Sequence, residues 1–273
     1  MLALDPSTFG ALPGLGMQGL IEVLLQFLAV SLRIGAFLIA SPLFGARMVP
    51  LQVRIVATIA IAAFVFARIE PPEASMLTDL RVVGIVAQEL AIGLAGGLVL
   101  TIVFSAASLA GEKIAATSGL SFAAQFDPNA GGQTPVLSQI FMLTLTMVFL
   151  ALNGHLVAIG LVIESYRIIP IGSGVPLLPL AGAGVEAAGT MFALAATIML
   201  PLVAILFMIN IAIGIVTKSA PTLNLFSFGF PITLIAAFVL LFLAARPLGE
   251  AFADLTDTGL GSLRAMLGGP NGG

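Results

Sequence analysis

Long stretches without charged side chains are the feature that most constrains how this chain can fold. Four of them, the second interrupted only by His155, lie at 90–111, 128–163, 187–217 and 219–245. A helix crosses about 30 Å of hydrocarbon with roughly 20 residues, so each stretch can hold a membrane-spanning helix.

Two further apolar segments precede these four, roughly at 19–41 and 49–69, although they contain Glu22, Arg33 and Arg54. Charged residues make up only 8% of the chain, against about 25% in a soluble domain. The mean hydropathy is +1.17, which is typical of membrane proteins. The sequence therefore predicts an all-α, membrane-class fold with about six long helices.

The composition excludes several classes of function. The chain has no cysteine and one histidine, which excludes disulfides, thiolate metal sites and a histidine-based metal cluster. A net charge of −3 and the lack of a basic run argue against nucleic-acid binding. Motifs for a phosphate loop, a Ser/His/Asp arrangement or a zinc hydrolase are missing. We therefore expect a protein that is not an enzyme and needs no cofactor or metal.

Proline- and glycine-rich connections divide the apolar segments, for example "SPLFGARMVP", "RIEPPEASMLTD" and "PIGSGVPLLPLAGAG". We expect an N-terminal tail at 1–18, a single helical domain at 19–250 and a polar, Gly-rich C-terminal tail at 251–273. The stretch 128–163 is longer than one crossing needs and contains "LNGHL". Its helix is therefore expected either to extend beyond the membrane or to break there.

The basic residues set no orientation for six simple spans. With six crossings, five basic residues would lie on the same side of the membrane as the N-terminus (Arg68, Arg81, Arg167, Arg246, Arg264). Four would lie on the opposite side (Arg47, Arg54, Lys113, Lys218). Cytoplasmic loops usually carry an excess of lysine and arginine. The nearly equal numbers of basic residues on the two sides argue against an ordinary six-span bundle in lipid.

Polar side chains inside the apolar segments are costly in hydrocarbon and usually face protein or water. The candidates are Arg33, Arg54, Gln88, Glu89, Asn153, His155 and Asn210. One hypothesis is a proton or ion relay. The other is structural, with charges paired across helix interfaces or placed near helix ends. The scattered positions favour the structural role, and the lone His155 is expected to be a hydrogen-bonded interface residue.

Close helix packing is predicted at Gly93 and Gly97, which form a G-x-x-x-G pair. Ser105, Ser108 and Gly111 continue the surface of small residues. Such a surface lets helix backbones approach closely in a membrane, but it does not identify the partner helix.

Six segments in order carry a resemblance to a known family: "LRIGAFLIASPLFGARMVPLQVR", "QELAIGLAGG", "GLSFAAQFDP", "LNGHL", "ESYRIIPIG" and "PTLNLFSFGFPITL". Together they span about residues 27–245 and closely resemble the FliR family of the flagellar type III export gate. The resemblance implies a core subunit that assembles with FliP-like and FliQ-like subunits, and with an FlhB-like gate protein, in the bacterial inner membrane at the flagellar basal body.

In FliR-like proteins the helices form hairpins that wind with partner subunits around a pore for unfolded export substrates, and much of the assembly is raised out of the bilayer. The ionisable residues of the first two segments would then be buried against sister subunits. The resemblance also implies contact with membrane lipid and no role as a catalyst.

The loop "SFAAQFDPNAGG" would then be a plug that helps to close the pore. The expected plug residues are Phe122, Gln125, Phe126, Asp127 and Pro128. The phenylalanines supply bulk that can obstruct a peptide, and the Asp-Pro and Gly-Gly pairs make a turn that can yield. An ordinary surface connection is the alternative.

Three alternatives to the flagellar export gate stay open. The homologous subunit of a virulence-associated (injectisome) secretion system shares the architecture. A secondary transporter with broken helices would use Pro201, Asn210 and the "LNGHL" interruption, but two matching halves are missing. A structural membrane scaffold would have no loop facing a pore.

Overall fold

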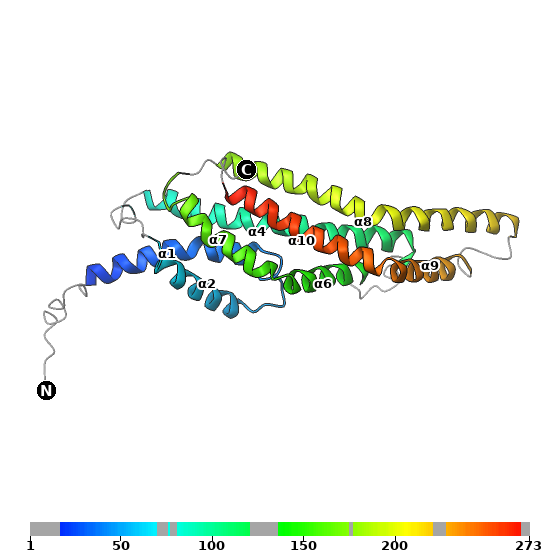
Figure 1. The fold of residues 1–273 in the computed structure, drawn as a ribbon, viewed down its shortest axis with the longest axis horizontal. Coiled ribbons are helices and arrows are strands. Elements are labelled where there is room, and N and C mark those ends of the chain that lie inside the picture. The colour runs from blue at the N-terminus through cyan, green and yellow to red at the C-terminus, as the bar shows by residue number, and fades with distance from the viewer. Residues whose placement is uncertain are drawn as a thin grey trace, which may run out of the picture. The chain divides into compact units, whose positions relative to one another are not determined.

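The computed structural model describes residues 17–69, 76, 81–120, 136–174, 177–220 and 228–268. The long elements in these ranges are all helices (Figure 1): α1 Met17–Ala40, α2 Leu51–Phe66, α4 Arg81–Thr117, α6 Val136–Ala151, α7 Gly154–Ile168, α8 Leu177–Ser219, α9 Phe230–Leu243 and α10 Ala245–Leu267. Within the described ranges there is no strand. The predicted all-α fold class is confirmed.

Three of these helices are long and apolar enough to cross a membrane, namely those that contain Gly19–Ala40, Arg81–Thr117 and Pro179–Ser219. Two pairs, α6 with α7 and α9 with α10, qualify only as bent pairs, which gives up to five spans among the described residues. The helix α2 is apolar but shorter, with 16 residues.

The predicted helix in 128–163 is broken. The helix α6 ends at Ala151, α7 begins at Gly154, and Asn153 between them has a φ of 56°. This left-handed conformation is tolerated by asparagine better than by most side chains, which explains why the chain turns at "LNGHL". Of the two alternatives for this stretch, the break is the one the structure contains.

The C-terminal segment differs from the predicted polar tail at 251–273, because α10 continues to Leu267. Its apolar residues Phe252, Leu255, Leu263 and Leu267 are all at most 3% exposed. Their spacing of three, four and eight residues repeats along one face of a helix. The segment looked polar because the other faces carry its charges and glycines.

The chain divides into two compact units. Among the described residues, the first contains 17–69, 76, 81–99, 158–174, 177–184 and 263–268, and the second contains 100–120, 136–157, 185–220 and 228–262. In the first unit α1 and α2 lie side by side (Figure 1). Val30, Ile34, Phe37 and Leu38 of α1 are buried. In the second unit the core contains edge-on aromatic pairs, Phe104 with Phe149 at 5.1 Å and Phe141 with Phe252 at 5.5 Å.

Candidate functional site

A fully buried ion pair joins α1 to α4 in the first unit. Arg33 of α1 and Glu89 of α4 are both 0% exposed. The Nε of Arg33 donates to Oε2 of Glu89 at 2.8 Å, and its Nη2 donates to Oε1 at 3.0 Å. This two-point geometry matches the planar guanidinium to the carboxylate and neutralises both charges inside apolar surroundings.

A residue of α7 and the residue that follows this helix supply the remaining hydrogen-bond acceptors of Arg33. Its Nη1 donates to the hydroxyl of Ser165 at 3.0 Å, and its Nη2 also donates to the carbonyl of Ile169 at 2.9 Å. All three guanidinium nitrogens of Arg33 therefore have acceptors, which a buried arginine requires because its donors cannot reach water.

Tyr166 adds a second link between α7 and α1. Its ring centroid lies 4.2 Å from the guanidinium carbon of Arg33, and its hydroxyl donates to the carbonyl of Val30 at 2.6 Å. The ring face is attractive to the cation, and the hydroxyl satisfies its own hydrogen bond. Three segments far apart in the sequence are thus tied at one point.

The two predicted packing glycines explain why α4 comes so close to α1. A Cβ on Gly93 would overlap the carbonyl of Arg33, and one on Gly97 would lie 2.6 Å from the Cβ of Ala40 and 2.8 Å from the carbonyl of Phe37. Glu89, Gly93 and Gly97 follow one another at four-residue intervals and share one helix face. The same face therefore supplies both the close approach and the buried carboxylate.

Arg33 is buried and bonded within its own chain, so for this residue the expected burial against a sister subunit is wrong. Arg54 likewise uses its own chain, because its Nη2 donates to the carbonyls of Ala46 at 2.7 Å and Gly45 at 3.3 Å. Arg54 is only half-buried. Both arginines hold helices and loops in place.

Three other predicted buried residues lie in the second unit. Asn210 is half-buried, and its side-chain amide donates to the carbonyl of Thr117 at 3.0 Å, which joins α8 to the end of α4. His155 is half-buried, and its Nδ1 has no hydrogen-bond partner among the described residues. Asn153 is exposed, contrary to the prediction, because it occupies the turn between α6 and α7.

The sequence interpretation missed Ser165 and Tyr166 as partners of Arg33. No local pattern marks them, because they lie more than 130 residues from Arg33 and from Val30, respectively. It also predicted no hydrogen-bond partner for Gln88, whose Oε1 accepts from the backbone amide of Gly174 at 3.0 Å. The expected plug residues 122 and 125–128 lie outside the described residues.

The arrangement is suited to holding helices together. Its charges neutralise each other, and Arg33 and Glu89 are inaccessible to solvent. The described residues contain no group of three or more His, Cys, Asp or Glu side chains that could hold a metal ion.

Comparison with known proteins identifies the family. Residues 24–259 match the family described as bacterial export proteins, family 1. The chain is 31% identical to the flagellar biosynthetic protein FliR of Bacillus subtilis (strain 168) over 255 residues, covering 92% of this chain and 98% of that protein. It is 33% identical to FliR of Escherichia coli (strain K12) over 224 residues, covering 82% and 85% of the two chains. A third relative, FliR of Aquifex aeolicus (strain VF5), is 29% identical over 226 residues, covering 82% and 86%. The resemblance predicted from the six segments is confirmed: the chain belongs to bacterial export proteins, family 1, the family of the flagellar biosynthetic protein FliR.

Proposed function

We propose that this chain is a core subunit of the flagellar protein export gate. Together with FliP-like and FliQ-like subunits it forms a channel through which unfolded flagellar proteins cross the bacterial inner membrane. An FlhB-like gate protein is a further partner in this proposal. Membership of a bacterial export family and the FliR relatives support a component of the flagellar export apparatus.

The apolar surface that the chain leaves uncovered is the observation that carries the proposal. The most apolar part of α8 has a mean hydropathy of 2.6 but is only 17% buried, whereas the corresponding part of α4 is 56% buried. Phe192 and Phe207 on α8 are 62% and 55% exposed. A surface of this kind requires lipid or other apolar subunits to cover it.

The lengths of α4 and α8 favour cover by protein over part of this surface. They contain 37 and 43 residues, which correspond to about 55 and 65 Å of helix. The hydrocarbon layer is about 30 Å thick. Each helix is therefore too long to lie upright within lipid, and its excess apolar surface must tilt into the bilayer or pack against partner subunits.

The flagellar system is favoured over a virulence-associated one because the relatives reported above carry the name of a flagellar biosynthetic protein. A role as a channel wall and not as an enzyme agrees with the family and with the neutralised charges around Arg33. The loop that contains Phe122 and Phe126 remains the proposed plug.

Photo-crosslinking at α8 tests the assembly directly. A photoreactive residue at Phe192 or Phe207 is expected to crosslink to a FliP-like or FliQ-like subunit in cells that contain the whole export apparatus. The matched control is Leu206, which is 0% exposed and should crosslink only within its own chain. Crosslinks from both phenylalanines to lipid alone, with no subunit captured, would contradict the proposal.

A further inference from the structure

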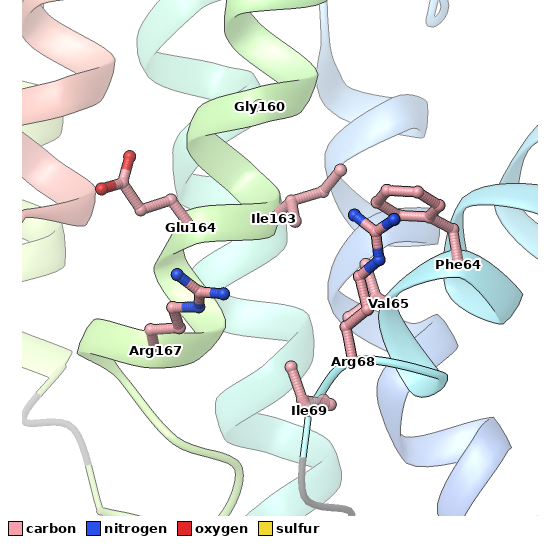
Figure 2. Close-up of a pocket in the computed structure, with 8 residues that line it drawn as sticks. All are labelled: Phe64, Val65, Arg68, Ile69, Gly160, Ile163, Glu164 and Arg167. Carbon is pink, nitrogen blue, oxygen red and sulfur yellow. The ribbon is translucent and has the colours of Figure 1, made fainter.

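A small cavity with a mixed charged and apolar lining lies in the first unit, between the end of α2 and the second half of α7 (Figure 2). Its volume is about 250 Å³. It is lined by Phe64, Val65, Arg68, Ile69, Gly160, Ile163, Glu164 and Arg167. The volume is below the roughly 300–1,000 Å³ of sites for drug-sized ligands, so the cavity suits a small group.

Two arginines face this cavity from different elements. Arg68 follows the end of α2, and Arg167 lies in the last turn of α7. Figure 2 shows them on opposite sides of Ile163, while the carboxylate of Glu164 points away from Arg68. Among the described residues neither arginine is in an ion pair, and with Glu164 they give the lining a formal net charge of +1.

The rest of the lining is apolar. Val65 is 1% exposed and lines the cavity. Phe64 is 46% exposed and lies under the guanidinium of Arg68, whose central carbon is 3.8 Å from the ring centroid. Beyond the cavity the outward side of α2 stays apolar, with Val53, Val56 and Ile59 between 50% and 66% exposed. A ligand held here would have charged contacts at one end and apolar contacts along the helix.

We propose that this cavity binds the headgroup of an anionic membrane phospholipid, one whose net charge is −1, with an acyl chain lying along the outward side of α2. The guanidinium groups of Arg68 and Arg167 donate to the phosphate oxygens, for which their planar, fork-like geometry is well suited. Basic pockets between apolar helices are sites of this kind for anionic headgroups.

The position of the cavity favours a lipid over an acidic side chain of a partner protein. Both arginines lie where an apolar helix ends, which is where a headgroup meets the hydrocarbon of a bilayer. The single net positive charge matches a monoanion, and the apolar surface that continues along α2 matches its tail. The proposal depends on membrane insertion but not on the channel function.

Native mass spectrometry of the full-length chain in complex with its FliP-like and FliQ-like partner subunits, purified in mild detergent and stripped of lipid, tests the proposal. The protein is titrated with phosphatidylglycerol and, separately, with phosphatidylcholine or inorganic phosphate. The double variant R68Q/R167Q is expected to lose about tenfold or more in affinity for phosphatidylglycerol, because it removes two charge-assisted contacts. Phosphatidylcholine, which has no net charge, and inorganic phosphate, which has no tail, should both bind the parent protein more weakly.

Two further variants separate the site from general effects. Gly160→Leu fills the cavity without changing its charge. A Cβ at Gly160 would have no heavy atom of the described residues within 4 Å, so the fold should be kept. It should weaken phosphatidylglycerol binding as well. The matched control is Arg264→Gln, since Arg264 is also an exposed arginine in the last turn of a helix but does not line the cavity. Its binding should equal that of the parent protein.

Three results would overturn the proposal. The first is unchanged phosphatidylglycerol binding in folded R68Q/R167Q or in Gly160→Leu. The second is equal binding of inorganic phosphate and phosphatidylglycerol, which would exclude a lipid as the ligand. The third is a crosslink from position 160 to a partner subunit in the assembled complex with no bound phospholipid, which would show that protein occupies the cavity.

Discussion

Replacing Glu89 by alanine is expected to destabilise the first unit strongly, because it leaves Arg33 buried without its carboxylate. Two hydrogen bonds are lost, from Nε at 2.8 Å and from Nη2 at 3.0 Å. Removing one partner of a buried pair typically costs about 3–5 kcal/mol. Ser165 and Ile169 still accept from Arg33, so we expect a value at the lower end, about 3 kcal/mol.

For a chain of this size, about 3 kcal/mol corresponds to a decrease of roughly 6–12 °C in the midpoint of thermal unfolding. The measurement is the helical circular dichroism signal on heating of the protein reconstituted into small lipid vesicles, where lipid covers its apolar surface. Intrinsic fluorescence is a poor probe here, since the chain has no tryptophan and one tyrosine. The control is Glu250→Gln, whose partner Arg246 and own side chain are 91% and 67% exposed. That exposed pair should change the midpoint by less than about 4 °C.

A double variant distinguishes the ion pair from general disruption of the core. Arg33→Met combined with Glu89→Leu removes both charges and keeps apolar volume, so it should be less destabilised than either single variant. The reasoning about Arg33 would be refuted if Glu89→Ala shifted the midpoint no more than Glu250→Gln, or if the double variant lost the sum of the two single losses.

Three more predictions concern packing, closure and assembly. Gly97→Leu should cost about 1–3 kcal/mol and lower the yield of folded protein, because its Cβ would lie 2.6 Å from that of Ala40; Gly84→Leu in the same helix has open space at its Cβ and should be neutral. Replacing 123–132 by a few glycine and serine residues should leave assembly intact but raise ion or dye leakage through the complete complex. Without FliP-like and FliQ-like partners the chain should aggregate on size exclusion in detergent, because its uncovered apolar surface is large.

Each of these has an outcome that would contradict it. Equal yields of the two glycine variants would show that Gly97 does not touch α1. Equal and negligible leakage in the parent and shortened complexes would remove the plug assignment, and lost assembly would make that loop an ordinary structural connection. A monodisperse monomer that functions after reconstitution would show that partners are not needed for stability.

The sequence was a reliable guide to where the apolar helices lie but not to where they end. A rule based on gaps between charges begins the third helix after Glu89, although α4 begins at Arg81. The rule fails here because Arg33 neutralises that carboxylate and allows it inside the fold. The same rule missed α10, where apolar residues occupy only one face and charges the others.

The candidate site shows a similar limit. Glu89, Gly93 and Gly97 share a helix face, so a close contact with a buried carboxylate could be predicted from spacing alone. The partner helix could not, because nothing in the sequence near Arg33 specifies which carboxylate it meets. Ser165 is a still harder case, since a serine in an apolar helix usually bonds to its own backbone, as this one also does to Val162.

The long separation along the chain between the partners of Arg33 has a consequence for biosynthesis. Glu89 follows Arg33 by 56 residues and Ser165 by 132. At a synthesis rate of about 5–20 residues per second, Glu89 is made roughly 3–11 s after Arg33, and Ser165 roughly 7–26 s after Arg33. During this interval α1 carries an unneutralised charge, so it cannot settle stably among lipid tails by itself. We therefore expect α1 to stay near the membrane surface or the insertion machinery until α4 emerges. Insertion of α1 would then be completed only when α4, the third apolar segment, is available to pair with it.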